Sequence, residues 1–360
     1  MPADSVNIHN SFLPTDTKSA LRTMASIDNF SLKINKAARF IPENEHDGRK
    51  FKFFKGGQDG FSPSPEFGEL EFEQIAQRHR HNIDALNLSV SICEATIDRR
   101  LIIGLGNESV YDTSMTLHHV YGIPYIPASA VKGVVRSWMI TEIFSDVSAD
   151  SDESDYPLVN AEYRAYQDEG FCRIFGCPAK TRKVMFKDDE PDKENGKYKY
   201  KTCDTALAKD HQGKVWFFDA FPLSKPEIEV DIMNPHYGDY YNSTNPEPPA
   251  DYLKPNPITF LTVGEKDSEE NPLRFQFLIG IKGTDNAPIG ENSKLFKDTN
   301  GEPIKVRSKD VSELVDASAD TPLSAIGEAW LKKALEEHGI GAKTAVGYGY
   351  MKDFQIGGES

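Results

Sequence analysis

The chain has 360 residues and is strongly acidic, with 41 lysines and arginines against 56 aspartates and glutamates and a formal net charge of −15. This balance excludes a protein that coats nucleic acid over its whole surface, although it leaves room for a local basic groove on an acidic body. Hydrophobic residues make up 38% of the chain, accompanied by 26 glycines and 22 prolines. We therefore expect a compact core that carries many loops.

The cysteines give no sign of a metal centre. None of the four belongs to a C-x-x-C pair, a common spacing of zinc ligands, so small buried thiols are the simplest interpretation. The chain also has no signal-peptide pattern and no apolar run near the length of a membrane span. We expect a cytoplasmic protein in a reducing compartment, with no cofactor, no bound metal and no membrane partner.

The N-terminal part divides into a tail and a segment of mixed character. Residues 1–25 are polar and aperiodic, which is typical of a flexible tail. From Phe30 onward, apolar residues alternate with the cations Lys33, Lys36 and Arg39. The alternation predicts either an amphipathic strand with solvated lysines, or a nucleic-acid surface on which cations neutralise phosphates and aromatic rings stack on bases.

A helix and a strand are predicted next. Residues 69–85 favour a helix, and the period-two alternation of apolar residues between 86 and 103 predicts a strand. A short strand and a proline-rich turn follow at residues 117–127. His118 and His119 lack a carboxylate at ligand spacing, so we do not expect them to bind a metal.

The next helix is predicted to begin near Ser129, whose hydroxyl is suited to capping free amides at a helix start. Its buried face would consist of Val131, Val134, Val135, Trp138 and Met139. Lys132 and Arg136 are four residues apart and share one flank of the helix, beside Gly133. Free amides and two cations at a helix start can bind an anion; a solvated basic face is the alternative.

Long polar stretches interrupt the rest of the chain. We expect insertions at about 143–165, 187–212, 238–256 and 283–320. In the second of these, Lys197, Lys199 and Lys201 alternate with Tyr198 and Tyr200, which predicts a hairpin with cations on one face and aromatic rings on the other. Between the insertions, residues 171–176 predict an apolar turn and residues 213–220 a buried strand.

The C-terminal part predicts two strands, a helix and a closing strand. Residues 258–263 and 273–281 alternate like two adjacent strands joined by an acidic turn. Thr321 is predicted to cap the last helix, with Pro322 in its first turn and Gly339 at its end. The order of elements is α+β. An antiparallel sheet backed by helices, in a ferredoxin-like or RNA-recognition-motif-like topology with long loop and hairpin insertions, is the simplest fold.

The most informative stretch lies between the last helix and the closing strand. It consists of Gly339, Gly341, Gly347 and Gly349 around Lys343 and Thr344. A P-loop is excluded, because a P-loop requires glycine where this chain has Ala342 and lies between a strand and a helix, in the reverse order. Exposed amides and a lysine would suit a phosphodiester backbone. The alternative is a turn in which glycines let a helix pack closely on a sheet.

Six short segments, taken together and in order, resemble one family: residues 122–133, 173–176, 213–220, 230–237, 255–260 and 339–349. The chain is similar to the RAMP superfamily of CRISPR proteins, most closely to the sixth subunits of the Cmr (type III-B) RNA-guided effector complex. The resemblance implies a RAMP domain over residues 26–360, elaborated by the insertions above and placed in an assembly of several subunits.

The resemblance implies a non-catalytic subunit that grips the backbone of the guide RNA (crRNA), contacts other Cmr/RAMP subunits and helps to hold the target RNA. The family's glycine-rich loop carries over to Gly339, Gly341, Lys343, Thr344, Gly347 and Gly349. Its serine–lysine helix start carries over to Ser129, Lys132, Gly133 and Arg136, although this chain has Ala128 and Ala130 where the family often has glycine and serine. Lys33, Lys36 and Arg39 would add phosphate contacts, and His236 is a candidate for stacking on a base.

Two other functions remain open. A metal-independent endoribonuclease of the same superfamily would use His236 or His118 as general base and Lys343 to stabilise the developing charge. A purely structural capping subunit would contact only protein. No acidic or histidine constellation in the sequence is typical of a catalytic centre, so we expect no enzymatic activity from the chain itself.

Overall fold

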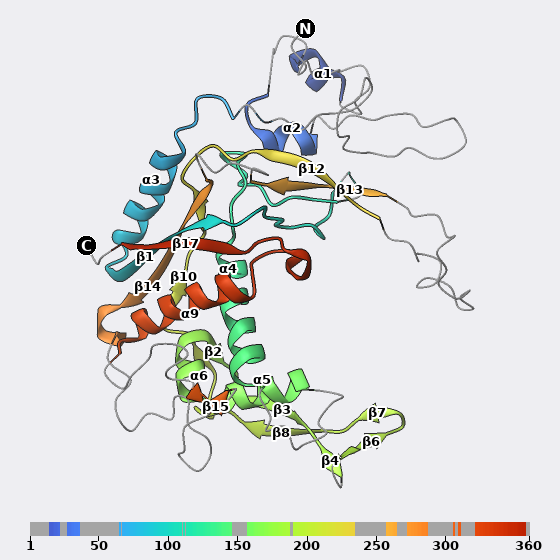
Figure 1. Ribbon diagram of the computed structural model, residues 1–360, viewed down its shortest axis with the longest axis vertical. Helices are drawn as coiled ribbons and strands as arrows, with labels where there is room; N and C mark the ends of the chain where they lie inside the picture. Colours follow the sequence, from blue (N-terminus) through green and yellow to red (C-terminus); the bar gives the residue numbers. More distant parts are fainter. Residues whose placement is uncertain are drawn as a thin grey trace.

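The computed structural model describes residues 14–21, 27–36, 65, 67–109, 111, 113–145, 157–187, 190–234, 257–264, 272–286, 305–306, 309–310 and 321–357. Within these residues the protein is a mixed α+β structure built on one central antiparallel sheet, as the sequence predicts (Figure 1). A smaller two-stranded sheet extends from one side of it, and a strand-rich insertion projects from the other end of the molecule. None of the helices in these ranges is long and apolar enough to cross a membrane.

The central sheet contains β1 (Leu88–Ile97), β10 (Trp216–Phe217), β11 (Phe221–Pro222), β14 (Arg274–Lys282) and β17 (Met351–Gly357). Its order is β10-β14-β1-β17, and every neighbouring pair is antiparallel. The pair β11–β14 continues the β10 edge of the sheet. The predicted strand at residues 213–220 is therefore only partly correct. It is interrupted because Ala220 directs both of its backbone hydrogen bonds to Ile126.

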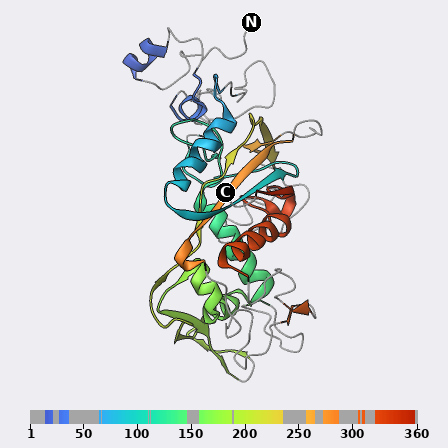
Figure 2. The ribbon, with the colours of Figure 1, turned by 90° about the vertical axis from the view of Figure 1, so that its left-hand side faces the viewer.

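Helices cover both faces of this sheet (Figure 2). The helices α4 (Ala128–Trp138) and α9 (Leu323–Glu337) lie on one face, and α3 (Phe72–Asp84) lies on the other. Side chains alternate between the faces along a strand. In β1, Cys93 therefore belongs to the main core, whereas Ile92 packs with Ile83 of α3 and Leu278 of β14. The predicted strands at β1 and β17 and the predicted helices at α3, α4 and α9 are confirmed.

The capping residues of α4 and α9 differ from the prediction. Pro127 and Pro322 occupy the N-cap positions, and neither Ser129 nor Thr321 caps its helix with a side chain. The free amides are satisfied from distant segments instead. Asp219 accepts the N–H of Ala128 at 2.7 Å, and Asn286 accepts the N–H of Ser324 at 3.1 Å. Local sequence cannot reveal such partners, because they lie 91 and 38 residues away.

Three other predictions are wrong. Residues 171–176 do not form a turn but belong mostly to α6 (Glu169–Phe175), which Asp168 caps by accepting the N–H of Phe171 at 2.6 Å. The segment that starts at Phe30 forms α2 (Phe30–Lys36) rather than a strand. The strand β13 (Ile258–Val263) pairs with β12 (Ile228–Met233), and β14 pairs with β1, so the two predicted neighbours are not paired with each other.

The remaining elements belong to the termini and insertions. The predicted tail contains α1 (Thr15–Leu21), and α4 continues into a π-helical turn, η2 (Met139–Ile143), before α5 (Pro157–Gln167). Paired strands form where the sequence predicts a lysine–tyrosine hairpin: β3 (Lys180–Val184) pairs with β8 (Tyr200–Asp204), and β6 (Lys193–Glu194) pairs with β7 (Lys197–Tyr198). The predicted separation of cations and rings onto opposite faces stays a prediction. Shorter pairs join β2 (Gly176–Cys177) to β9 (His211–Gln212), β4 (Phe186–Lys187) to β5 (Glu190–Pro191), and β15 (Lys305–Val306) to β16 (Lys309–Asp310). The predicted insertion at 238–256 lies outside the described residues.

Candidate nucleic-acid interface

The glycine-rich loop (residues 339–349) has an unusual backbone. Five of its residues have positive φ angles: Gly339 (71°), Gly341 (98°), Lys343 (59°), Gly347 (96°) and Gly349 (76°). Glycine adopts such angles freely, but lysine does so at a cost of about 1–3 kcal/mol. Gly339 follows the last residues of α9, and its N–H bonds to Ala334 at 3.1 Å, so it ends the helix as the sequence predicts.

Hydrogen bonds fasten both ends of the loop to the segment that follows β1. The N–H of Ala342 donates to the carbonyl of Ile102 at 2.8 Å, and the N–H of Gly349 donates to the carbonyl of Arg100 at 2.7 Å. A third bond, from the N–H of Ile340 to the carbonyl of Gly349 at 2.8 Å, closes the loop on itself. The loop is therefore a fixed part of the fold rather than a loose connection.

The crest of the loop is a short 3₁₀ turn, η4 (Thr344–Val346). Within the described residues, the N–H groups of Lys343, Thr344 and Ala345 donate to no protein oxygen. Ala345 and the neighbouring Val346, which is 67% exposed, place this turn at the protein surface. Consecutive free amides of this kind can bind an anion such as a phosphate.

Two cations flank this crest. The Lys343 ammonium lies 5.5 Å from the centre of the Phe260 ring, a cation–π contact that orients the side chain. The exposed Arg99 follows β1, and its Nη1 lies 4.0 Å from the place where a Cβ on Gly347 would be. The sequence did not single out Arg99, because only the tertiary fold brings the end of β1 to the loop.

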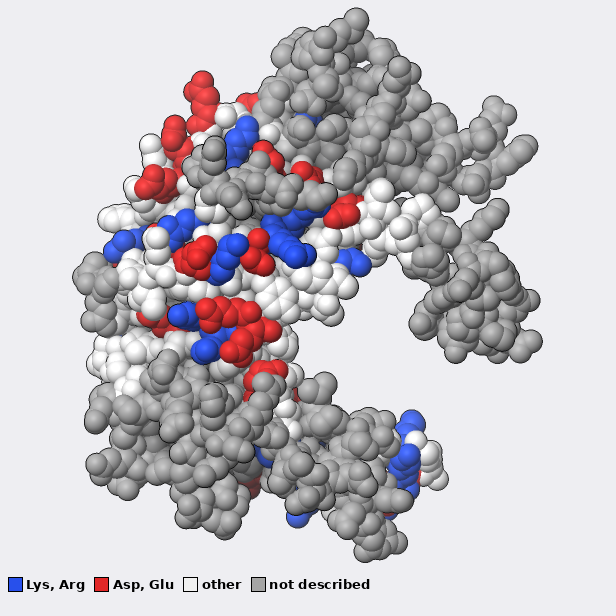
Figure 3. Space-filling model, viewed as in Figure 1, with Lys and Arg blue, Asp and Glu red and all other residues white. Residues whose placement is uncertain are grey.

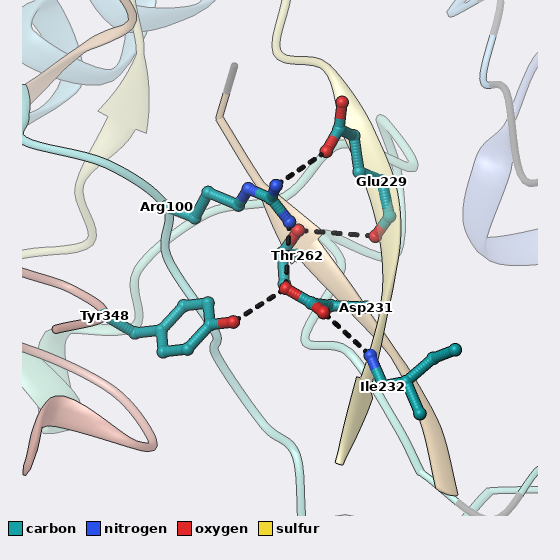
Figure 4. Close-up of polar contacts among 6 residues, drawn as sticks. All are labelled: Arg100, Glu229, Asp231, Ile232, Thr262 and Tyr348. Carbon is teal, nitrogen blue, oxygen red and sulfur yellow. Dashed lines mark hydrogen bonds and ion pairs between the residues drawn. The ribbon is translucent and has the colours of Figure 1, made fainter. Parts of the chain in front are cut away.

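A partly buried ionic network holds the loop in place (Figure 4). Arg100 is only 8% exposed, and its guanidinium contacts Asp231 Oδ2 at 2.9 Å and Glu229 Oε2 at 3.1 Å. The hydroxyl of Tyr348, in the loop, donates to the same Asp231 oxygen at 2.7 Å. Burial, followed by this hydrogen bond, raises the pKa of Tyr348 to about 12. The loop is thus tied to β12, the strand that carries both carboxylates (Figure 4).

The start of α4 forms a second cationic position. Ser129 and Gly133 are exposed, and a side chain on Gly133 would meet no atom within 4 Å. Lys132 is half-buried between them, and burial, with a smaller effect of Arg136, lowers its pKa. Arg136 itself is occupied, since it pairs with Glu162 and donates to the Tyr166 hydroxyl at 2.9 Å. The predicted flank is therefore divided: Lys132 lies half-buried between the exposed Ser129 and Gly133, and Arg136 ties α4 to α5.

The helix α4 contacts the end of α9, the helix that leads into the glycine-rich loop. Ser137 Oγ lies 3.4 Å from His338 Nε2, and Trp138 Nε1 donates to Glu337 Oε2 at 2.9 Å. These contacts join the end of α4 to the end of α9, immediately before the loop begins. Lys132 lies five residues before Ser137, or about 7.5 Å along the helix axis.

The other predicted positions lie on α2 or outside the described residues. Lys36 is exposed at the end of α2, whereas Lys33 is only 6% exposed and is not available on the surface. Asn29, just before α2, donates to the carbonyl of Val120 at 3.0 Å and fastens the helix to the turn at residues 119–122. Arg39 and His236 lie outside the described residues.

A cluster of imidazole and aromatic rings lies near the start of α4, in contact with α3. The ring of His118 stacks on Tyr121 at 4.8 Å and on His119 at 5.1 Å, and its Nδ1 accepts the N–H of Tyr121. The ring of His79 lies 5.0 Å from that of Phe221. Burial lowers the pKa of both His79 and His118, although Asp219 opposes the shift. Among the described residues, no three potential ligands are grouped as a metal site requires.

We expect this cluster to make folding pH-dependent. The unfolded chain binds protons at His79 and His118 near pH 6.5, about the usual pKa of histidine, whereas the folded protein binds them only at lower pH. Stability should therefore be full above about pH 6.5 and decline below it. The decline in melting temperature between about pH 7.5 and about pH 5.5 should be smaller for His79→Gln than for the parent. His81→Gln, at an exposed position of the same helix, is the control and should decline like the parent.

Comparisons with known proteins identify relatives of this chain. The chain is 33% identical over 281 residues to the CRISPR system Cmr subunit Cmr6 of Pyrococcus furiosus, a match that covers 71% of this chain and 65% of the relative, just under two thirds of its length. A chain in a cryo-EM structure of the type III-B Cmr-beta bound to cognate target RNA matches at 17% identity and a TM-score of 0.39, covering 80% of this chain and 68% of that one. The crystal structure of Cmr6 from Pyrococcus furiosus matches at 27% identity and a TM-score of 0.34, covering 74% and 98%.

Both TM-scores are low, so the assignment rests on sequence. A family model described as the RAMP superfamily matches residues 95–352, a range that begins in β1 and includes α4, β14, α9 and the whole glycine-rich loop. This range covers most of the chain and contains the segments that form the candidate interface. The chain belongs to the RAMP superfamily.

Proposed function

We propose that this chain is a non-catalytic subunit of a type III-B CRISPR effector complex, in which it binds the guide RNA (crRNA) beside the target RNA and other Cmr/RAMP subunits. The observation that carries the proposal is the crest of the glycine-rich loop. Three free amides, Lys343 and Arg99 together present positive charge and hydrogen-bond donors on a rigid support. The similarity to a Cmr subunit supplies the RNA-guided context.

The chemistry of this crest suits RNA backbone rather than RNA sequence. Amides and cations contact phosphate oxygens, which are the same for every nucleotide and carry no sequence information. A subunit that accepts guides of any sequence needs contacts of this kind. The half-buried Lys132 would extend the same backbone track from the start of α4, beside the exposed Ser129 and Gly133.

A ferredoxin-like topology is part of the proposal. The connections from β1 through α4 to β10 and from β14 through α9 to β17 each pass over the same face of the sheet. With the order β10-β14-β1-β17, each connection returns parallel to its starting strand with one antiparallel strand between them. This is the split β-α-β arrangement of ferredoxin-like domains.

The proposal is tested by removing the cation at the crest. Lys343→Asn, alone or with Arg99→Gln, should weaken binding of guide RNA by the assembled complex; asparagine is chosen because it tolerates a positive φ. Each lost phosphate contact should cost about fourfold in affinity at 0.15 M salt and should reduce the slope of log K against log salt by about 0.7. Lys343→Arg keeps the charge, and Lys282→Asn removes an exposed lysine at the far end of β14; both should bind like the parent.

Unchanged affinity and an unchanged salt slope in Lys343→Asn/Arg99→Gln would contradict the proposal and leave a structural capping subunit. An endoribonuclease is tested separately, by incubating labelled RNA with the chain in the presence of a metal chelator. We expect intact RNA, because the structure uses His118 in ring stacking and in a hydrogen bond to Tyr121. Cleavage that survives chelation and disappears in His118→Gln would establish the enzyme instead.

A further inference from the structure

The hairpin of β3 and β8, with its tip of β6 and β7, projects from the molecule far from the glycine-rich loop, at the lower right of Figure 1. We call residues 180–204 the basic finger. It contains eight lysines and arginines against six aspartates and glutamates, in a chain where acidic residues outnumber basic ones by 56 to 41. Basic side chains are prominent at its tip (Figure 3), whereas the central face of the body carries both charges interspersed.

The cations of the basic finger are incompletely neutralised by the protein. Lys183 and Lys201 face each other directly across the two strands, an arrangement of like charges that destabilises a sheet. The ammonium of Lys183 lies over the Tyr163 ring at 5.1 Å, and Lys199 pairs with Asp192 at 3.2 Å. Among the described residues, Lys201 is exposed and has no carboxylate within ion-pair distance. A polyanion would relieve this repulsion.

Aromatic residues alternate with these cations along the chain, and both line the same depression. Tyr200 is 48% exposed, and it alternates along the chain with Lys199 and Lys201. An open depression of about 710 Å³ at the finger is lined by Tyr198 and Tyr200 together with Lys197, Lys199 and Lys201. One of the carboxylates that line it, Asp192, is already paired with Lys199. An exposed ring beside several cations is the combination that binds single-stranded nucleic acid, because bases stack on the ring while phosphates meet the cations.

We propose that the basic finger is a second RNA-binding surface, which takes single-stranded RNA without sequence preference. An acidic protein partner would match the lysines equally well, but it would give no reason for the exposed Tyr200 ring. The inference shares its ligand class with the proposed function but concerns a different surface, so the two can fail independently. RNA that leaves the glycine-rich loop would be held again at the far end of the molecule.

The test is fluorescence-anisotropy titration of the full chain with a labelled, unstructured single-stranded RNA, over a series of salt concentrations. Lys197→Gln/Lys201→Gln should bind about tenfold more weakly at 0.15 M salt, with a salt slope smaller by about 1.4. The matched variant Lys197→Arg/Lys201→Arg should bind like the parent. Tyr200→Leu should bind the RNA about 5- to 100-fold more weakly than the parent, whereas Tyr200→Phe, which keeps the ring, should retain the affinity. The three residues changed, Lys197, Tyr200 and Lys201, are all exposed, and circular dichroism checks that each variant is folded.

The outcomes separate this inference from the proposed function. If the glutamine and leucine variants bind like the parent while Lys343→Asn is weaker, the finger inference is overturned and the guide-binding loop stands. If the parent chain does not bind the RNA at low salt, the finger inference is overturned as well. The role of the glycine-rich loop then depends only on the guide-RNA affinity of the assembled complex. If the finger variants keep RNA affinity but associate more weakly with partner subunits, the finger is a protein-docking surface instead.

Discussion

Gly349→Ala is expected to destabilise the protein by about 2–4 kcal/mol and to abolish guide-RNA binding by the glycine-rich loop. Gly349 is buried with φ 76°, and a Cβ there would overlap the carbonyl oxygen of Ile340. Alanine must therefore accept a left-handed backbone and also push apart a backbone contact that no side-chain rotation can relieve. The N–H of Gly349 bonds to Arg100 at 2.7 Å, so a shift here would release the loop from its support.

Urea denaturation and RNA titration of the same samples check this expectation. Gly106→Ala is the control, because an added Cβ at Gly106 would meet no atom within 4 Å. The control should change stability by less than about 1 kcal/mol. If Gly349→Ala unfolds at the same urea concentration as the parent, the loop can relax without cost, and it cannot be the rigid anion site that we propose. If stability falls but RNA affinity does not, the loop serves packing alone.

The second large effect is expected from Arg100→Met. This change removes the buried cation that Asp231 and Glu229 share, at 2.9 and 3.1 Å. Breaking a buried ion pair by deleting one partner costs about 3–5 kcal/mol. The two carboxylates are about one third exposed, so water can solvate them in part, and we expect about 2–3 kcal/mol. Tyr348→Phe should lose one hydrogen bond to a partly exposed carboxylate, about 1.5 kcal/mol.

A double-mutant cycle measures this coupling. Arg100→Met/Asp231→Asn should be more stable than the sum of its single changes implies, because the neutral amide no longer needs the guanidinium. The free energies of unfolding come from urea titrations of the four proteins. Additive effects of the two changes would show that the Arg100 guanidinium and the Asp231 carboxylate, drawn in Figure 4, do not stabilise each other. In the effector complex, Arg100→Met should also weaken the binding of guide RNA, although the buried Arg100 does not itself contact the RNA, because the loop loses its support.

These two predictions concern the support of the site rather than its contact atoms. Lys343 and the amides of η4 can bind RNA only if the positive-φ backbone is maintained. Arg100, Asp231 and Tyr348 maintain it from beneath, through contacts between segments more than 100 residues apart. A preorganised loop binds a phosphate without first paying the entropy of ordering itself.

The sequence by itself determined the elements whose signals are local. Period-two alternation located β1, helical periodicity and Gly339 located α9 and its end, and the glycine spacing identified the loop around Lys343. The series of short segments also identified the superfamily, which the match over residues 95–352 confirms. Each of these signals is contained in a stretch of neighbouring residues, where backbone propensity and side-chain periodicity act.

Only the tertiary structure decided which partners those elements meet. Asp219 rather than Ser129 accepts the free N–H at the start of α4. The strand β13 pairs with β12 rather than with β14. Arg136 pairs with Glu162 instead of an external anion. Arg99 and Arg100, just after β1, and Asp231, in β12, meet the loop from remote segments, and nothing in their local sequence distinguishes them from ordinary surface charges. Hydrogen bonds and ion pairs depend on distance in space, and packing of the core, not local propensity, sets that distance.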